Sequence, residues 1–210
     1  MSFKNTVLFI FSILLIDQVT KFYIKTHFQL YEDVEVFPWF KIYFVENDGM
    51  AWGTRFSDIF PFISEYHAKR LLSVFRLVAV AGIGYWLYST VKAQTSTLLT
   101  LAIALVFAGA LGNIIDSVGY GVLFTDSHGQ VAQFLPEKGY APLLHGKVVD
   151  MLYFPLWKGY LPEWLPFAGG KYFVFFEPVF NIADIAISLG FLILLIFNKR
   201  AFEKQPKNGK

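Results

Sequence analysis

Residues 98–118 read LLTLAIALVFAGALGNIIDSV, an apolar run that is interrupted near its end by Asn113 and Asp116. A bilayer core of about 30 Å requires about 20 mostly apolar residues to cross it as a helix. This stretch meets the requirement, so we expect it to span a membrane. A charged side chain at the centre of a spanning helix costs about 2.5–3.5 kcal/mol on insertion scales. Asp116 therefore needs a partner or a task.

The composition of the whole chain also favours a membrane protein. Its 210 residues are 55% hydrophobic and only 16% charged, and 24 of them are Phe, whereas soluble domains carry about a quarter charged residues. The formal net charge of +2 is too small to indicate a nucleic-acid partner. The chain has no Cys, which excludes disulfides, thiolate nucleophiles and Cys-based zinc sites.

Three further segments are long and apolar enough to span a bilayer, at about residues 6–24, 71–91 and 179–197. The first of them resembles a signal peptide in its apolar core. No small-x-small cleavage site follows it, however, so we expect it to be retained as a helix.

The orientation of these helices follows from the Lys and Arg residues that flank them. If four helices alternate, Lys4, Lys92 and the basic tail 198–210 fall on one side, which the positive-inside rule assigns to the cytoplasm. We therefore expect both termini to be cytoplasmic. The long loops 25–70 and 119–178 are then expected to lie on the outer side.

The outer loops carry signals for local structure. Residues 34–45 alternate as a strand does, and Pro38 suits a turn between two short strands. Residues 60–67 are expected to form a short interfacial helix. The second loop is rich in residues that suit an aromatic belt at headgroup depth, namely Tyr153, Phe154, Trp157, Tyr160, Trp164 and Phe167.

These observations predict a mainly α, polytopic membrane protein. It has four transmembrane helices, a small extracytoplasmic β-sheet and a short interfacial helix. We expect residues 1–210 to form a single membrane-embedded domain.

Polar residues at four other places also need an explanation. Asp17 and Lys21 are four residues apart on one helical face, which suits a structural ion pair. Asn47-x-Gly49 is typical of a turn, and its small residue allows the backbone to approach a neighbour closely. Asp150, taken alone, is an ordinary aspartate at the end of a strand or in a loop.

The fourth place is the start of the last apolar segment, where Asn181 and Asp184 repeat the Asn-x-x-Asp spacing of residues 113–116. One interpretation makes Asn181 an N-cap, with Asp184 favoured by the helix dipole. The other makes Asp184 one of two catalytic carboxylates. The residues alone leave both open.

Two carboxyl groups that share one proton can hydrolyse a peptide bond without a metal or a cysteine. The ionised carboxylate takes a proton from water, and the protonated one donates to the scissile carbonyl. Other peptidase signatures are missing from the sequence, since it has no HExxH and no Gly-x-Ser-x-Gly, and its four His residues are scattered.

Taken together, five motifs resemble those of the lipoprotein signal peptidases of bacteria, the type II signal peptidases. The motifs occur in the order of the family and cover nearly the whole chain. They are Asp17-Gln18-x-Thr20-Lys21, Asn47-x-Gly49-x-Ala51-Trp52-Gly53, Gly112-Asn113-x-Ile115-Asp116, Val148-Val149-Asp150 and Phe180-Asn181-x-Ala183-Asp184-x-x-Ile187.

This resemblance implies an aspartyl endopeptidase of the bacterial cytoplasmic (inner) membrane, with its active site near the outer face. Its partners would be membrane lipids and prolipoproteins whose Cys bears a diacylglyceryl group, and it would cut just before that Cys. By motif, Asp150 and Asp184 are the catalytic dyad. The residues that support the dyad or bind substrate are Asn47, Gly49, Asn113, Asp116 and Asn181, and those that brace the fold are Asp17 and Lys21. No cofactor or metal is implied, and we expect a monomer.

The chain also departs from the family pattern. Ser117 stands where the family often has Arg, so we expect different contacts with substrate carbonyls or with the inhibitory cyclic peptide globomycin. Residues 119–145 and 155–172 are long for the family and have no assigned role. The small residues Gly109, Ala110 and Gly112 are expected to leave room for an acyl chain or a signal helix.

Two alternative functions use the same residues differently. In a small proton-coupled transporter, Asp17, Asp116 and Asp184 would form a proton relay. That function leaves Asn47 and Asp150 unexplained. In a membrane scaffold the carboxylates would be incidental, and proton flux into proteoliposomes would separate a transporter from a peptidase.

Overall fold

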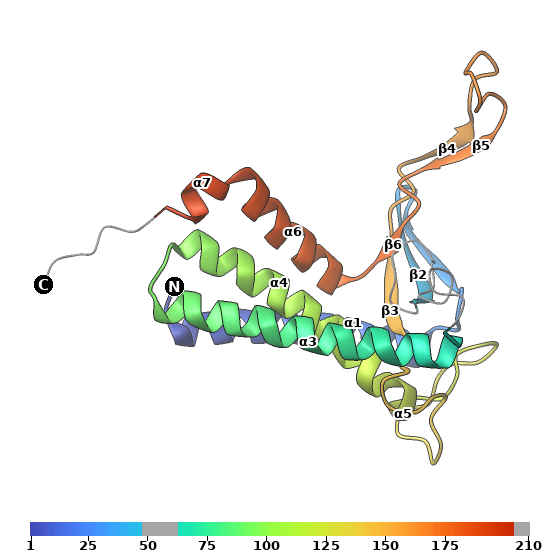
Figure 1. The fold of residues 1–210 in the computed structure, drawn as a ribbon. Coiled ribbons are helices and arrows are strands. Elements are labelled where there is room, and N and C mark those ends of the chain that lie inside the picture. The colour runs from blue at the N-terminus through green and yellow to red at the C-terminus, as the bar shows by residue number, and fades with distance from the viewer. Residues whose placement is uncertain (48–62, 204–210) are drawn as a thin grey trace, which may run out of the picture.

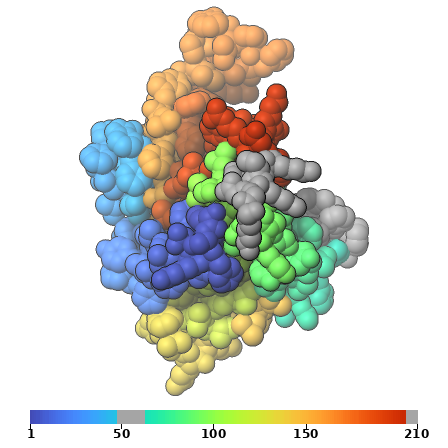
Figure 2. Space-filling model, turned by 90° about the vertical axis from the view of Figure 1, so that its left-hand side faces the viewer, coloured from blue at the N-terminus to red at the C-terminus, as the bar shows by residue number. Residues whose placement is uncertain are grey.

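A computed structural model describes residues 1–47 and 63–203 of the chain. Four apolar helices form its body, and α4 lies between the other three (Figure 1). These helices are α1 (Phe3–His27), α3 (Glu65–Lys92), α4 (Thr97–Ile115) and α6 (Ile182–Ile196). The start of α1 and the short helix α7 (Asn198–Ala201) lie at the same end of the bundle, where Figure 2 looks onto them.

The expected mainly helical membrane fold is confirmed, although the lengths of the helices differ from the expected spans. The helical segments Phe3–His27, Glu65–Lys92 and Thr97–Leu123 are long and apolar enough to cross a membrane. The third of them continues beyond α4 through a π-helical turn, η2 (Asp116–Tyr120), and α5 (Gly121–Leu123). All three run past the predicted limits because a helix continues through polar residues once it leaves the apolar layer.

The fourth span was predicted to begin at residue 179, and that boundary is wrong. Val179 and Phe180 form a short strand, β6, and the 15-residue helix α6 begins at Ile182. Asn181 separates them, because its side chain accepts a hydrogen bond from the backbone N–H of Asp184 and so caps the helix. Apolar residues that precede an N-cap are free to pair in a sheet.

The sheet has four antiparallel strands in the order β1-β2-β3-β6. Its strands are β1 (Asp33–Phe37), β2 (Phe40–Asn47), β3 (Val148–Tyr153) and β6 (Val179–Phe180). The turn at Pro38 lies between β1 and β2, which confirms the two short strands that the sequence predicts. The order brings together the end of β2 at Asn47, the middle of β3 at Asp150 and the residue that follows β6, Asn181.

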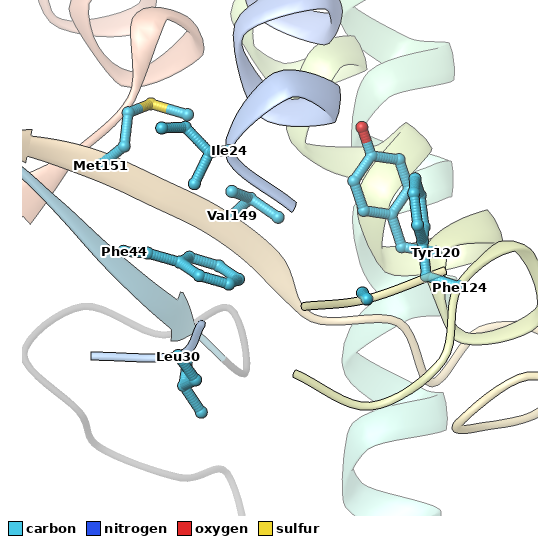
Figure 3. Close-up of a cluster of buried hydrophobic side chains, with 8 residues drawn as sticks. Ile24, Leu30, Phe44, Tyr120, Phe124, Val149 and Met151 are labelled. Carbon is cyan, nitrogen blue, oxygen red and sulfur yellow. The ribbon is translucent and has the colours of Figure 1, made fainter. Parts of the chain in front are cut away.

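One face of this sheet packs on the ends of the helices that lie opposite to the start of α1 (Figure 1). Phe44 of β2 and Val149 of β3 are fully buried there, beside Ile24 of α1 and Tyr120 of η2 (Figure 3). Side chains alternate along a strand, so residues next to Val149 point to the other face. The cluster therefore fixes the direction in which Asp150 points.

The two long segments have different structures. Residues 124–147 fold beneath the sheet, and Phe124, Ala132 and Tyr140 pack against the buried cluster. Residues 155–176 form a hairpin of β4 (Trp157–Tyr160) and β5 (Tyr172–Phe175) that projects away from the helices (Figures 1 and 2).

Two further expectations change in the structure. The expected interfacial helix at residues 60–67 lies partly outside the described residues, and its described end belongs to the start of α3. Gly109 and Gly112 do not leave room for a ligand, because added Cβ atoms would lie 2.2 Å from the Ala183 carbonyl oxygen and 2.7 Å from Asp17 Oδ2. These glycines allow α4 to pack closely on α6 and α1.

Candidate active site

Asp150 lies on the face of β3 that points away from the buried cluster. Its neighbour across the sheet is β2, in which Asn47 pairs with Val148. Asn47 and Asp150 therefore share a face of the sheet as diagonal neighbours, a separation that side chains can span. Asn47 Nδ2 donates a hydrogen bond to Asp150 Oδ2 over 3.2 Å.

Asn181 connects the two carboxylates that the sequence singles out. Its side-chain Nδ2 donates to Asp150 Oδ1 over 2.6 Å, and its backbone N–H donates to Asp184 Oδ2 over 3.2 Å. Asn181 Oδ1 in turn accepts from the backbone N–H of Asp184 at 2.9 Å. The capping interpretation of Asn181 is therefore correct, and the same cap holds Asp184 next to Asp150.

Asn113 of α4 holds Asp184 from the other side. Asn113 Nδ2 donates to Asp184 Oδ1 over 2.9 Å, while Asn113 Oδ1 accepts from Lys21 Nζ over 2.8 Å. An ammonium group only donates, so Lys21 requires the oxygen of Asn113 to face it. The amide nitrogen must then face Asp184. Lys21 thus orients a residue that touches the candidate dyad.

Lys21 forms ion pairs with two buried carboxylates. Lys21 Nζ lies 2.9 Å from Asp17 Oδ2 and 2.9 Å from Asp116 Oδ2, and all three side chains are at most 1% exposed. Asp116 Oδ2 also accepts from the backbone N–H of Val149 over 3.3 Å. Asp17 Oδ1 accepts from the backbone N–H of Ala183 over 2.9 Å. The ion-pair network therefore ties α1 and α4 to β3 and to the start of α6.

The electrostatic environment of Asp150 favours its protonated form. Burial is the largest cause that raises the pKa of Asp150 to about 7, and the negative charge of Asp184 is the second. The hydrogen bonds from Asn47 and Asn181 lower this pKa in part. A carboxyl group with this pKa exchanges its proton near neutral pH. Asp150 thus has the properties of a group that can hold and donate a proton in catalysis.

The structure brings together most of the residues that the sequence predicts for the site. Asp150, Asp184, Asn47, Asn113 and Asn181 form one connected group, and Asp17, Lys21 and Asp116 adjoin it through Asn113. Gly49 lies outside the described residues. Among the described residues, no group of three or more His, Asp or Glu side chains is arranged to hold a metal ion.

Sequence reasoning missed several polar contacts around this group. Gln18 Nε2 donates to Asp17 Oδ2 and to Asp116 Oδ1, each over 3.0 Å. Lys25, which is fully buried, pairs with Glu46 of β2 and donates to Ser127 Oγ over 2.8 Å. The spacing of Asp17, Lys21 and Lys25 at four-residue steps places them on one face of α1, and it is the signal that could have revealed this second buried pair.

Comparison with known proteins shows the family of the chain. The sequence model of the family described as Signal peptidase (SPase) II matches residues 9–199 of the chain. The chain belongs to the signal peptidase II family. It is therefore an aspartic-type peptidase, and its family consists of membrane proteins. The enzyme class that the sequence resemblance implies is confirmed.

Relatives within the family are similar over most of their length. The lipoprotein signal peptidase of Porphyromonas gingivalis is 48% identical over 186 residues, which cover 88% of this chain and 78% of the relative. The lipoprotein signal peptidase of Amoebophilus asiaticus is 34% identical over 195 residues, which cover 91% of this chain and 75% of the relative. These names support cleavage of lipoprotein signal peptides as the task of signal peptidase II proteins of this kind.

Two solved structures share the fold. Both are described as a bacterial membrane enzyme determined by the in meso method, one at 2.3 Å and one at 1.9 Å resolution. The first has a TM-score of 0.56 at 24% identity and covers 99% of this chain and 96% of that chain. The second has a TM-score of 0.59 at 24% identity and covers 93% of each chain.

Proposed function

We propose that this signal peptidase II uses Asp150 and Asp184 as a catalytic dyad to cut diacylglyceryl-modified prolipoproteins just before the lipidated Cys. The observation that carries the proposal is the bridge through Asn181, which hydrogen-bonds to Asp150 with its side chain and to Asp184 with its backbone. Both carboxylates are thereby held in one small volume, as proton sharing requires.

The chemistry divides between the two carboxyl groups. Asp184, in its ionised form, accepts a proton from water while the water oxygen bonds to the scissile carbonyl carbon. Asp150, in its protonated form, donates its proton to the carbonyl oxygen. When the tetrahedral intermediate collapses, the C–N bond breaks and the leaving amine takes the proton that Asp184 received from water. Asp150 regains a proton from a hydroxyl of the intermediate, which becomes the new carboxyl group. Water supplies the oxygen of the new carboxylate and all protons are accounted for.

The surrounding residues have positioning roles in this proposal. Asn47 and Asn181 hold Asp150, and Asn113 holds Asp184. Asp116 fixes the backbone of β3 next to Asp150 through its contact with Val149. Asp17 and Lys21 brace the helices around them.

The dyad is proposed to lie near the outer face of the bacterial cytoplasmic membrane, with both termini in the cytoplasm. The positive-inside rule supports this orientation, because Lys4, Lys92, Lys199 and Arg200 lie at the end of the bundle opposite to the sheet. A lipidated substrate remains in the bilayer. At a site between the helix ends and the sheet, this substrate arrives from the lipid, and water arrives from the outer side.

The test is cleavage of a precursor peptide with and without the diacylglyceryl group by the purified protein in lipid nanodiscs. We expect cleavage of the lipidated precursor alone, with products whose masses place the cut directly before the modified Cys. Equal cleavage of both precursors, or a cut elsewhere, would contradict the proposed substrate. Proton flux into proteoliposomes, which a transporter would produce, should not exceed that of empty vesicles.

A further inference from the structure

Arg76 is a cation in the membrane-spanning helix α3 that has no ion pair among the described residues. The buried cations of α1 differ, since Lys21 contacts two carboxylates and Lys25 contacts Glu46. A charge within a span is costly, and such residues usually serve a function. The position of Arg76 therefore requires an explanation that fold stability does not give.

The guanidinium of Arg76 lies next to the candidate dyad. Its Nη1 is 3.5 Å from Ser117 Oγ, a hydroxyl that donates its own hydrogen to the Asn113 carbonyl oxygen over 3.0 Å and so faces Arg76 as an acceptor. Arg76 and Asp184 also attract each other electrostatically. The contact with Ser117 is long for a hydrogen bond, and it satisfies one of the five N–H donors of the side chain.

A cavity of about 150 Å³ lies at this guanidinium. It is open between α3, α4 and α6, where Figure 1 shows α3 and α6 diverging on either side of α4. Arg76 and Asn113 are its polar lining residues, and Asn113 is the residue that donates to Asp184. The apolar lining consists of Ala79, Val80, Ile83, Ala110, Ile114 and Ile187.

The remaining donors of Arg76 are accessible. Among the described residues, no buried side-chain nitrogen or oxygen lacks a hydrogen-bond partner. The Arg76 nitrogens that do not contact Ser117 have no hydrogen-bond partner among these residues. They are therefore not buried and keep accessible surface. A cation that lines an otherwise mostly apolar cavity is suited to an uncharged ligand with a strong hydrogen-bond acceptor, because the low dielectric of the surroundings strengthens such a bond.

We propose that Arg76 is a substrate-binding residue, which donates an N–H to a carbonyl oxygen of the lipidated precursor near the scissile bond. The inference rests on the proposed function and adds to it a binding group from α3. Two parts of the substrate carry such an oxygen, the peptide backbone and the fatty-acyl esters of the diacylglyceryl group. Arg presents several donors in a planar fork, so Lys does not replace it fully.

The test measures binding separately from cleavage. In the Asp150→Asn background, a fluorescent diacylglyceryl precursor peptide is titrated into nanodiscs that carry Arg76 or Arg76→Gln. We expect the Kd to rise roughly 10- to 100-fold, as for loss of a hydrogen bond from a charged donor. Arg70→Gln, on the exposed side of the same helix, is the matched control and should leave the Kd unchanged.

Two further variants and one substrate analogue keep the outcome interpretable. Arg76→Lys retains the charge and should bind more weakly than the parent and more tightly than Arg76→Gln. Arg76→Ser combined with Ser117→Arg exchanges two residues that contact each other, so that η2 supplies the guanidinium, and should regain most of the binding. The analogue is a precursor with ether-linked chains, which lacks the ester carbonyls. If the acceptor is a backbone carbonyl, Arg76→Gln should still weaken the binding of this precursor. If the acceptor is an ester carbonyl, Arg76→Gln should leave its binding unchanged.

The proposal is overturned if Arg76→Gln, shown to be folded by its thermal unfolding, binds both precursors within twofold of the parent. It is also overturned if the loss in Arg76→Gln is equalled in Arg70→Gln. Failure of the protein with both aspartates to cleave the lipidated precursor would instead contradict the proposed function, because that result comes from a different measurement.

Discussion

Lys21 Nζ lies 2.8 Å from Asn113 Oδ1, and this contact determines which way the Asn113 amide faces. With its oxygen on Lys21, Asn113 can only present its nitrogen to Asp184. A cation that the sequence assigns to bracing the fold is thus one residue away from the candidate dyad. Its removal should affect both stability and cleavage.

Lys21→Met should destabilise the protein by about 3–5 kcal/mol, because it leaves Asp17 and Asp116 buried without their counter-charge. Thermal unfolding in detergent measures the loss. Lys4→Met, at the exposed start of the same helix, is the control and should change stability by less than about 0.5 kcal/mol. Equal unfolding temperatures for the two variants would show that the network is not needed for stability.

The raised pKa of Asp150 predicts how cleavage depends on pH. If Asp150 donates a proton in the reaction, kcat/KM should fall about tenfold per pH unit above the pKa of about 7. Asn47→Ala removes a hydrogen bond that lowers this pKa, so the alkaline limb should move to higher pH while the maximal rate decreases. Asp126→Asn, whose side chain is 45% exposed and outside the site, should leave the limb in place. An alkaline limb that moves downward in Asn47→Ala would contradict the assignment of Asp150 as the proton donor.

The buried pair of Lys25 and Glu46 should support the site from the neighbouring position in β2. Their side chains are 0% and 3% exposed, and Glu46 directly precedes Asn47. Glu46→Gln should lower the free energy of unfolding by about 3–5 kcal/mol, because the buried Lys25 keeps its charge and loses its counter-charge. Glu35→Gln, whose side chain is 56% exposed, should cost at most about 1 kcal/mol. Replacing the pair together, by Lys25→Met with Glu46→Leu, should restore much of the stability, and no recovery would mean that the pair itself is required.

The hairpin of residues 155–176 should rest on the outer leaflet. In its ladder, Trp157 pairs with Phe175, and Phe173 lies on the same apolar face, while Lys158 and Tyr160 alternate with them. In a variant that retains Trp157 as its only Trp, the Trp fluorescence should be quenched by lipids that are brominated close to the headgroup. The comparison is a variant that retains only Trp86 of α3, which should be quenched best by lipids brominated deeper in the chain. Trp157 fluorescence that no brominated lipid quenches would place the hairpin in water.

Much of this arrangement could be predicted from the sequence, because the signals are local. Hydropathy alone finds α1, α3 and α4, and Pro38 marks the turn between β1 and β2. The Asn-x-x-Asp spacing allows Asn181 to cap a helix as one of two interpretations, and the cap is present. Because apolar residues suit both a strand and a helix, hydropathy could not show that Val179 belongs to β6.

The contacts that complete the site join residues far apart in the chain. Lys25 meets Glu46 only after β2 folds back on α1, and Arg76 meets Ser117 only when α3 packs on α4. The register of β2 on β3 decides that Asn47 reaches Asp150. No local pattern encodes a register or a helix packing, so these partners could be found only in the structure.

The most direct measurement is cleavage of a diacylglyceryl-modified precursor by purified Asp150→Asn and Asp184→Asn, with Asp126→Asn as the control. Each of the first two variants should lose at least about 100-fold in kcat/KM and remain folded, because neither an acid nor a base alone completes the reaction. The control should cleave at the rate of the unmodified protein. If Asp150→Asn or Asp184→Asn, still folded, cleaves within a few-fold of that rate, the protein does not work by the proposed dyad.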